Sequence, residues 1–363
     1  MGSVVKRLDE YQRAHPWLGF PLAVAKKFGE DKAGHLAALV SYYAFFSLFP
    51  LLMVFTAVLG MLLRGNPELQ DAIVDSALTQ FPVIGDQISG EVGSLEGSAV
   101  ALGVGIVTAL WAGMGVTTAL QAALNAVWDV PIRRQPNFLI ARLRSLIMLA
   151  VLGVLTIGAA LLSGLGGGPG AIEVGLRVLG IAGGIAVNLV LFMLAFKILT
   201  NRELTWWEIF PGAAVAAGGW AVLQVLGTWF VDRQLAGATR TYGEFAFVIG
   251  LLVWLYIGAQ LTLYAAEVNA VKANRLWPRG LRKEPMTEAD PRALRRIAKV
   301  EERREDEEVD VSFNGDRAAD PTDSTEAGDD SRAAVRRARD ALEEARGAVA
   351  EARQAVEESS EDR

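Results

Sequence analysis

The stretch LAALVSYYAFFSLFPLLMVFTAVLGMLL, residues 36–63, carries no charged side chain over 28 positions. A helix of about 20 residues crosses the hydrocarbon core of a bilayer, so this stretch is long enough to span a membrane. Five more charge-free runs of at least 19 residues follow it before residue 267. One such run can be the buried helix of a soluble protein, but six of them within 231 residues predict a polytopic membrane protein.

The fold class that follows is all-α, a membrane helix bundle with six transmembrane helices. The composition agrees, because 52% of the residues are hydrophobic and only 21% are charged. We expect a membrane domain over residues 36–275, preceded by a cytoplasmic N-terminal segment at residues 1–35. The expected spans are 36–63, 99–127, 145–166, 177–198, 209–231 and 245–267.

The distribution of basic residues predicts the orientation. Lysine and arginine concentrate in residues 1–35, between the second and third spans, and after the sixth span, whereas the loop at 64–96 has one basic and six acidic residues. Because loops rich in lysine and arginine stay in the cytoplasm, both termini are expected there. Within the outer loop, apolar residues recur at helical spacing. This spacing predicts short amphipathic helices at about 67–95 that either cover the bundle or gate it.

The chain beyond the last span has a different character. Residues 276–330, first basic and then acidic, are predicted to be a disordered cytoplasmic linker. Residues 331–358 show a heptad pattern with alanine at every second seam position. This pattern indicates a charged C-terminal helix, which is either isolated or forms a weak coiled-coil contact with itself or a partner. The basic side chains expected to contact anionic lipid headgroups are Lys272, Arg275, Arg279, Arg282 and Lys283.

Polar residues inside the predicted spans are candidates for function, because a polar side chain in lipid has to find a partner. We expect a cavity open to the cytoplasmic side, lined by Tyr42, Tyr43, Ser47, Asn125, Asn188, Lys197, Gln260, Glu267 and Asn269. The alternative is that the amides tie helices together and that charged residues such as Lys197 and Asp129 lie at the headgroup boundary. Pro50 is predicted to kink the first span, because it removes a backbone donor.

The residues for several kinds of catalysis are missing from the sequence. The chain has no cysteine and two histidines, neither of them in an H-x-E or H-E-x-x-H arrangement, so it carries no zinc-ligand motif. It also lacks a G-x-x-x-x-G-K-[ST] loop for ATP. We therefore expect no metal, no cofactor and no enzymatic activity. The basic residues directly follow a membrane span, which favours lipid headgroups over nucleic acid as their partner.

Four stretches, in this order, resemble one family. They are HLAALVSYYAFFSLFPLLM at 35–53, ALQAALNAVWDV at 119–130, WWEIFPGAAVAAGGW at 206–220 and TYGEFAFVIGLLVWLYIGAQLTLYAAEVNAV at 241–271. Over residues 28–275 the chain is similar to the YihY/BrkB family of bacterial inner-membrane proteins, formerly mislabelled ribonuclease BN. The resemblance implies six spans, a place in the bacterial inner membrane, and transport of amphipathic or lipid-linked envelope components. It gives no proven role to the matching positions, which are Tyr42, Tyr43, Ser47, Pro50, Asn125, Trp254, Tyr256, Glu267 and Asn269.

Two functions from different classes follow from these features. The first is a transporter or flippase-like protein that works without ATP on an amphipathic or envelope-related substrate. Because the six spans show no inverted repeat, we expect such a carrier to be a homo-oligomer. The alternative is a membrane scaffold whose cytoplasmic tail recruits partners, and the long charged tail favours it.

Overall fold

The computed structural model of the chain describes residues 2–62, 99–164, 172–230, 244–282, 286–313 and 339. The regular elements within these ranges are all helical, which agrees with the predicted all-α class. Their bounds are α1 (Gly2–Ala14), α2 (Pro16–Glu30), α3 (Ala33–Leu62), α6 (Ala99–Val127), the short 3₁₀ turn η2 (Ile132–Arg134), α7 (Phe138–Gly164), α8 (Ile172–Leu199), α9 (Trp206–Phe230), α11 (Glu244–Asn274) and α12 (Ala289–Lys299).

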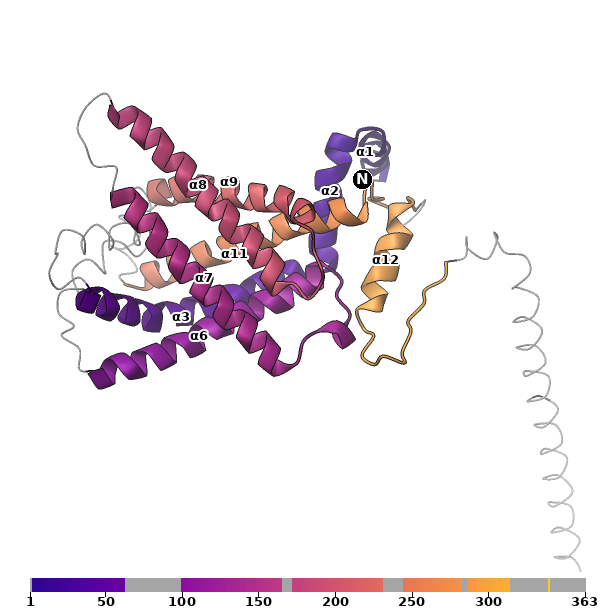
Figure 1. Cartoon of the computed structure of the whole chain (residues 1–363). Helices are drawn as coiled ribbons and strands as arrows, with labels where there is room; N and C mark the ends of the chain where they lie inside the picture. Colours follow the sequence, from indigo (N-terminus) through magenta and orange to yellow (C-terminus); the bar gives the residue numbers. More distant parts are fainter. Residues whose placement is uncertain are drawn as a thin grey trace, which may run out of the picture. The chain divides into compact units, whose positions relative to one another are not determined.

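Helices α3, α6, α7, α8, α9 and α11 form a bundle, and α1, α2 and α12 gather at one end of it (Figure 1). At this end α2 and α12 run across the direction of the bundle helices. The turn from α6 to α7 and the connection from α8 to α9 lie at the same end. We call it the charged end, comprising α1, α2, α12 and the connecting residues 128–137, 200–205 and 275–282.

Five helices are long and apolar enough to cross a membrane within the described residues, over Gly105–Val127, Phe138–Leu155, Ala182–Leu199, Trp206–Gly227 and Val248–Asn274. A shorter apolar stretch, Ala33–Leu48, belongs to α3. Large apolar side chains point outward from the spans, as Trp111, Leu139 and Val225 show with exposed fractions of 71%, 75% and 71%. Such outward apolar faces suit lipid, because each helix already satisfies its own backbone hydrogen bonds.

The observed helix ends refine the predicted spans. Helix α6 covers residues 99–127 as predicted, but α7 begins at Phe138 rather than at 145. The charge-free criterion excluded Arg142, whose guanidinium lies 4.9 Å from the centre of the Phe138 ring in the first turns of α7. Helix α11 continues to Asn274 and places Glu267 inside the helix. Charged side chains are tolerated in the terminal turns of a span, so a charge-free run underestimates its length.

The buried core lies mainly in the half of the bundle next to the charged end. Its largest cluster combines the first turns of α3, the last turns of α6 and α8, the first turns of α9 and the second half of α11. Leu124, Phe196, Ile209 and Leu263 are fully buried there. The charged end is therefore attached to the most tightly packed part of the described bundle.

Glycines let α9 approach α11 closely. A Cβ atom on Gly212 would lie 2.0 Å from the carbonyl oxygen of Ala265, and one on Gly227 would lie 2.1 Å from the Trp254 ring. Gly219 faces Leu261 at 2.6 Å in the same way. Gly212 is the most restricted of these positions, because the neighbouring atom belongs to the backbone of α11, whereas Gly219 faces the end of a flexible leucine side chain.

Helix α3 continues through Pro50 to Leu62. The Ser47 hydroxyl donates a hydrogen bond of 2.8 Å to the carbonyl of Ala44, one turn before the proline. Pro50 leaves the carbonyl of Phe46 without its usual helical donor, so the bond from Ser47 to Ala44 does not replace that donor. The kink at Pro50 stays a prediction.

The predicted disordered linker is wrong for residues 289–299, which form α12. Alternating arginine, leucine and alanine give this helix an amphipathic pattern, and Ala289, Asp290 and Ala293 are buried. The buried Ala293 packs with Ala23 of α2 and Val271 of α11. The predicted outer helices at 67–95 lie outside the described residues, as does nearly all of the predicted helix at 331–358.

Candidate functional site: a buried ionic cluster

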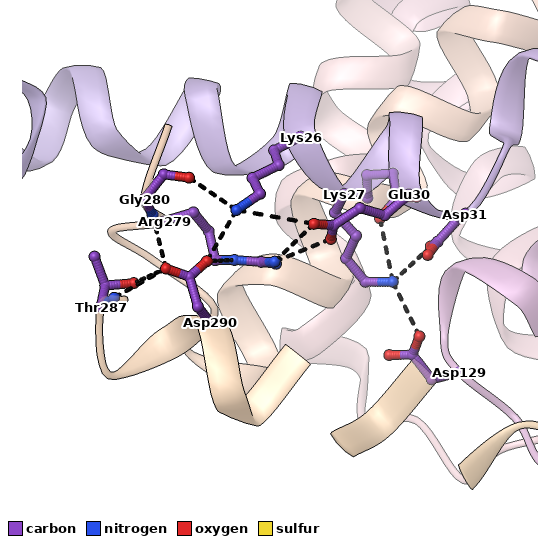
Figure 2. A network of polar contacts seen from close by, with 10 residues as sticks. Lys26, Lys27, Glu30, Asp31, Asp129, Arg279, Gly280, Thr287 and Asp290 are labelled. Carbon is purple, nitrogen blue, oxygen red and sulfur yellow. Dashed lines mark hydrogen bonds and ion pairs between the residues drawn. The ribbon is translucent and has the colours of Figure 1, made fainter. Parts of the chain in front are cut away.

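The charged end contains a buried ionic cluster around Lys27 of α2. The Lys27 ammonium contacts Asp31 Oδ2 at 2.5 Å and Asp129 Oδ1 at 3.2 Å, and it lies 3.8 Å from Glu267 Oε2. The exposed fractions of these four side chains are between 0% and 4%. Figure 2 shows Lys27 pointing between Asp31 and Asp129. We call Lys27, Asp31, Asp129, Glu267 and Arg296 the Lys27 cluster.

Asp129 connects the cluster to α12. Its second oxygen, Oδ2, pairs with Arg296 Nε at 3.1 Å, and Arg296 also donates to the carbonyl of Trp128 at 3.2 Å. The backbone of Asp129 has a positive φ of 51°. Val130 N–H bonds to the Asn125 carbonyl at 2.9 Å, the pattern that ends a helix with a left-handed residue. Aspartate tolerates this conformation better than most residues, so the end of α6 turns the carboxylate toward Lys27.

The cluster holds three carboxylates and two cations, so one carboxylate is in excess when all five groups are ionised. Neither oxygen of Glu267 accepts a hydrogen bond from the described residues. The Asp31 and Glu267 carboxyls lie close enough to hydrogen-bond to each other. Two carboxyl groups form that bond only when one of them is protonated. The Asp31 and Glu267 pair is therefore suited to bind one proton, which would remove the excess negative charge of the cluster.

Burial and the neighbouring charges shift the pKa values of Lys27 and Asp31 in opposite directions. Burial alone would lower the pKa of Lys27, but attraction to the three carboxylates outweighs it and raises the pKa above the ordinary value for lysine. Burial also raises the pKa of Asp31, although the neighbouring Lys27 opposes that shift. The lysine therefore stays charged, and the aspartate binds a proton more readily than an exposed aspartate does.

A second ionic network lies beside the first, on the neighbouring residue of α2. Figure 2 shows Lys26 pointing away from the Lys27 cluster toward Asp290 and Gly280. Lys26 Nζ lies 2.9 Å from Asp290 Oδ1 and 2.8 Å from the Gly280 carbonyl. Arg279 is 1% exposed, and it pairs with Asp290 at 2.7 Å and with Glu30 at 2.9 Å. We call this the Asp290 network; it fastens α12 to α2.

Asp290 is also bound through the backbone. Its Oδ2 accepts hydrogen bonds from the amides of Gly280 and Thr287 and from the Thr287 hydroxyl, at 2.8 to 3.0 Å. Burial raises the pKa of Asp290, but the hydrogen bonds from Arg279, Thr287 and Lys26 outweigh that effect, and the net pKa lies well below the ordinary range. The carboxylate is therefore ionised at any physiological pH.

Three predicted cavity residues lie at the charged end, where they tie segments together. Asn125 Oδ1 accepts the Asn201 amide at 2.9 Å, which joins α6 to the connection from α8 to α9. Asn269 Oδ1 accepts the Gly212 amide at 2.6 Å, where α11 meets α9. Lys197 donates to the Leu204 carbonyl at 2.6 Å and lies 4.8 Å from the centre of the Trp206 ring.

The other predicted residues do not join these contacts. Tyr42 and Tyr43 are 55% and 41% exposed on α3. Asn188 donates to the Gly184 carbonyl of its own helix at 3.0 Å, and Gln260 donates to the Tyr256 hydroxyl at 2.9 Å. Of the predicted set, the structure brings only Glu267 into the Lys27 cluster. A single cavity lined by the whole set stays a prediction.

The predicted headgroup residues occupy two kinds of position. Lys272, Arg275 and Arg282 are exposed, as a contact to lipid headgroups requires. Arg279 is buried in the Asp290 network and is not free for such a contact. Lys283 lies outside the described residues.

The sequence did not single out most of the cluster. Lys27 lies in the N-terminal segment that is expected in the cytoplasm, Asp129 is expected at the headgroup boundary, and no sequence pattern used above gives Asp31 or Arg296 a role. The usable signal is in α2, where Lys27 and Asp31 are spaced i and i+4 beside the apolar run PLAVA at 21–25. A lysine and an aspartate on one face of a partly apolar helix point to a buried ion pair.

A cavity of about 930 Å³ opens beside the Lys27 cluster at the charged end. It is lined by the end of α6, the turn η2, the connection from α8 to α9, α12 and the acidic residues that follow α12. Asp129 and Arg296 belong to both the cavity wall and the Lys27 cluster. Within the described residues, no group of three or more histidine, cysteine or carboxylate side chains is arranged to hold a metal ion. In the Lys27 cluster, the Lys27 ammonium occupies the position between the carboxylates that a metal ion would need.

Comparisons with known proteins agree with these features. A model of the virulence factor BrkB family matches residues 24–290. The chain is 28% identical over 259 residues to the ribonuclease-like protein YfkH of Bacillus subtilis (strain 168), which covers 68% of this chain and 91% of YfkH. It is 24% identical over 284 residues to the inner membrane protein YhjD of Escherichia coli (strain K12), covering 73% of this chain and 83% of YhjD. No solved structure matches the chain.

The family match includes the second half of α2, the described spans and the Asp290 network. It therefore covers the Lys27 cluster except for Arg296, which lies just beyond it. Together with the long apolar helices, the match shows that this chain is an integral, multi-pass membrane protein that belongs to the virulence factor BrkB (YihY) family.

Proposed function

We propose that this protein is a transporter of the bacterial inner membrane, that it works without ATP, and that it carries an amphipathic, envelope-related substrate. The observation that carries the proposal is the Lys27 cluster, which places three carboxylates and two cations at the end of a membrane bundle. Ionisable groups buried in membrane proteins are costly and commonly mark the path of a substrate or a proton.

The topology in this proposal has six spans. Helix α3, which runs from Ala33 to Leu62, is the span added to the five candidates. The charged end faces the cytoplasm, because Arg133, Arg134, Arg142 and Arg144 lie at or near the turn between α6 and α7. The printed name of the relative YhjD supports the inner membrane as the location.

The Lys27 cluster is suited to act as the cytoplasmic gate. It joins α2, the turn after α2, α6, α11 and α12 through contacts that converge on Lys27 and Asp129. In this mechanism, opening the charged end moves α2 away from α6 and α11 and separates these charges. A proton delivered to the Asp31 and Glu267 pair removes one charge from the cluster and changes the balance between closed and open states.

Transport in proteoliposomes tests the proposal. Purified protein is reconstituted with a fluorescent phospholipid, and the transfer of that lipid between leaflets is followed by chemical quenching from outside. We expect wild-type protein to exceed protein-free vesicles and Glu267→Gln to lower the rate at least several-fold. Glu10→Gln is the control, since Glu10 is an exposed carboxylate that pairs with Lys6 on α1. A wild-type rate equal to that of protein-free vesicles would refute transport of such lipids.

Removing the C-terminal tail distinguishes the scaffold alternative from the transporter. A chain ending at residue 313 keeps α12 and both ionic networks. The transporter proposal expects this truncated chain to keep its transport rate and its cellular phenotype. Loss of the phenotype with an unchanged transport rate would favour a scaffold that recruits partners through the tail.

A further inference from the structure

The cavity beside the Lys27 cluster is lined by five basic and seven acidic side chains. Arg133, Arg134, Arg202, Arg296 and Lys299 line it, from the turn η2, the connection from α8 to α9, and α12. Two of these side chains are already paired, Arg133 with Glu302 at 2.7 Å and Arg296 with Asp129 at 3.1 Å. Among the described residues, Arg134, Arg202 and Lys299 form no ion pair with a carboxylate. The cavity therefore presents three cations that form no direct ion pair, although carboxylates also line it.

Arg202 is held in a fixed position at this wall. Its guanidinium lies 5.0 Å from the centre of the Trp128 ring and donates to Asn274 Oδ1 at 3.3 Å. Burial and the nearby Arg296 lower the pKa of Arg202, although the carboxylates of Glu208 and Asp129 oppose that shift. An arginine that is stacked on an aromatic ring loses little side-chain freedom on binding an anion, and its planar fork fits phosphate oxygens.

We propose that this cavity is a binding site for a phosphate-bearing anion, with Arg202 as the central ligand and Arg134 and Lys299 beside it. A phosphate suits three separated cations, because it presents several charged oxygens in different directions. A volume of about 930 Å³ has room for a phosphate group with a substituent, as small-molecule sites commonly do. This site goes beyond the transport proposal, since it is defined by equilibrium binding and not by movement across the membrane.

The acidic residues after α12 also line the cavity, and their charge limits its affinity for an anion. Residues 300–302 bond to the turn η2, with the Ile132 amide donating to the Val300 carbonyl at 3.1 Å and the Arg133 amide to the Glu302 carbonyl at 2.9 Å. This attachment holds Glu305, Glu307 and Glu308 against the cavity. Their negative charge repels an anion, so neutralising them strengthens binding whereas neutralising Arg202 weakens it.

Binding to the full chain tests the site. The protein is reconstituted in phosphatidylcholine nanodiscs and titrated by calorimetry with glycerol phosphate, and in a second arm with a short-chain phosphatidic acid. We expect Arg202→Gln to weaken binding about tenfold or more, the loss typical of one charge-assisted hydrogen bond. We expect the double variant Glu305→Gln and Glu308→Gln to strengthen it.

A matched arginine serves as the control. Arg142→Gln removes a guanidinium that also lies over an aromatic ring, 4.9 Å from the centre of Phe138, but is not part of the cavity wall. This variant is expected to bind like wild type. If Arg202→Gln fails to fold, as helical circular dichroism would show, Lys299→Gln at the exposed end of α12 replaces it with the same expected direction.

The results of the two arms distinguish a soluble phosphate from a lipid headgroup, and they decide whether the site exists. Binding of both ligands with loss in Arg202→Gln supports the site with a soluble or a lipid phosphate, and binding of phosphatidic acid alone supports a lipid headgroup. No heat with either ligand, or equal binding by wild type and Arg202→Gln, overturns the site. A protein that binds phosphate but does not transport lipid refutes the transport proposal and leaves this one standing.

Discussion

At the scale of single residues, Lys27 is the side chain on which the charged end depends. It is the partner shared by Asp31, Asp129 and Glu267, and its exposed fraction is 2%. A buried charge whose partner is removed is far more costly than a complete buried ion pair. Removing one of the three carboxylates is therefore expected to destabilise the folded protein less than removing Lys27.

Replacing Lys27 by methionine is expected to lower the free energy of unfolding by about 3–5 kcal/mol, because three buried carboxylates lose their common cation. The measurement is unfolding by sodium dodecyl sulfate in mixed micelles, followed by tryptophan fluorescence. Lys26→Met is the neighbouring control and should lose less, because Arg279 remains paired with Asp290.

A combined variant separates charge from packing at the same site. Adding Asp31→Asn and Glu267→Gln to Lys27→Met removes two of the unpaired carboxylates, and Asp129 keeps Arg296 at 3.1 Å. Most of the lost stability should return. Equal losses in Lys27→Met and in the combined variant would show that the lysine acts through its packed hydrocarbon chain and not through its charge.

At the scale of helices, the contact between α9 and α11 depends on glycine. Asn269 reaches across it to the Gly212 amide, and the Ala265 carbonyl occupies the space that a side chain on Gly212 would need. A backbone atom cannot move aside as the end of a flexible side chain can. The sequence does not by itself identify which glycines of α9 face α11, and the structure does.

Gly212→Ala is expected to destabilise the bundle by about 1–3 kcal/mol or more, since the added methyl group overlaps the carbonyl of Ala265. The matched control is Gly218→Ala in the same helix, where a Cβ would meet no atom within 4 Å. That control should be neutral or gain up to about 1 kcal/mol of helix propensity. Similar unfolding curves for the two variants would contradict the close contact.

The docking of α12 on α2 is a second property at this scale, and its pH dependence follows from Asp290. The pKa of Asp290 is lowered in the folded protein, whereas an unfolded aspartate titrates near about 3.9. The folded protein thus binds this proton more weakly than the unfolded chain. The contribution of Asp290 to folding stability is complete at pH values above the ordinary pKa of aspartate. It is lost as the pH falls from there through the lower pKa that Asp290 has in the folded protein.

We therefore expect α12 to stay docked from neutral pH down to about 4 and to separate only in stronger acid. Because the chain has no cysteine, spin labels at Ala25→Cys and Leu294→Cys report the distance between α2 and α12 without background. The distance distribution should broaden below pH 4. Asp290→Asn should broaden it already at neutral pH, and an unchanged distribution in that variant would exclude the Asp290 network as the fastening.

At the scale of the whole molecule, the sequence predicted the class, five of the spans and their helical bounds to within a few residues, apart from α7 and α11. Charge-free runs are a strong signal, because the bilayer excludes charge over a fixed thickness. The same criterion places Lys27 and Asp129 outside the spans, and it counts Lys197 and Glu267 only as polar groups within them. It therefore had no means to recognise that Lys27 and Asp129 are buried against Glu267.

The candidate site was less predictable for a physical reason. Its members come from α2, α6, α11 and α12, and the paired residues Lys27 and Glu267 are 240 positions apart in the sequence. Such contacts depend on how helices cross at one end of the bundle, and no local pattern encodes that geometry. The disordered linker was predicted from composition alone, whereas α12 is ordered by contacts with Ala23 and Val271.

The central claim is that the Lys27 cluster belongs to a gate, and locking it provides the most direct test. Phe28 of α2 and Tyr264 of α11 stack with ring centroids 3.8 Å apart, directly beside Lys27. The variant Phe28→Cys with Tyr264→Cys, in a chain without other cysteines, can be bridged by a short thiol cross-linker that contains a cleavable disulfide.

The measurement is lipid translocation by this variant in proteoliposomes before cross-linking, after cross-linking and after reduction. We predict that the cross-link stops translocation and that reduction restores it, because α2 has to leave α11 for the charged end to open. Unchanged translocation in the cross-linked protein would show that the Lys27 cluster is a static fastening and would contradict the gate.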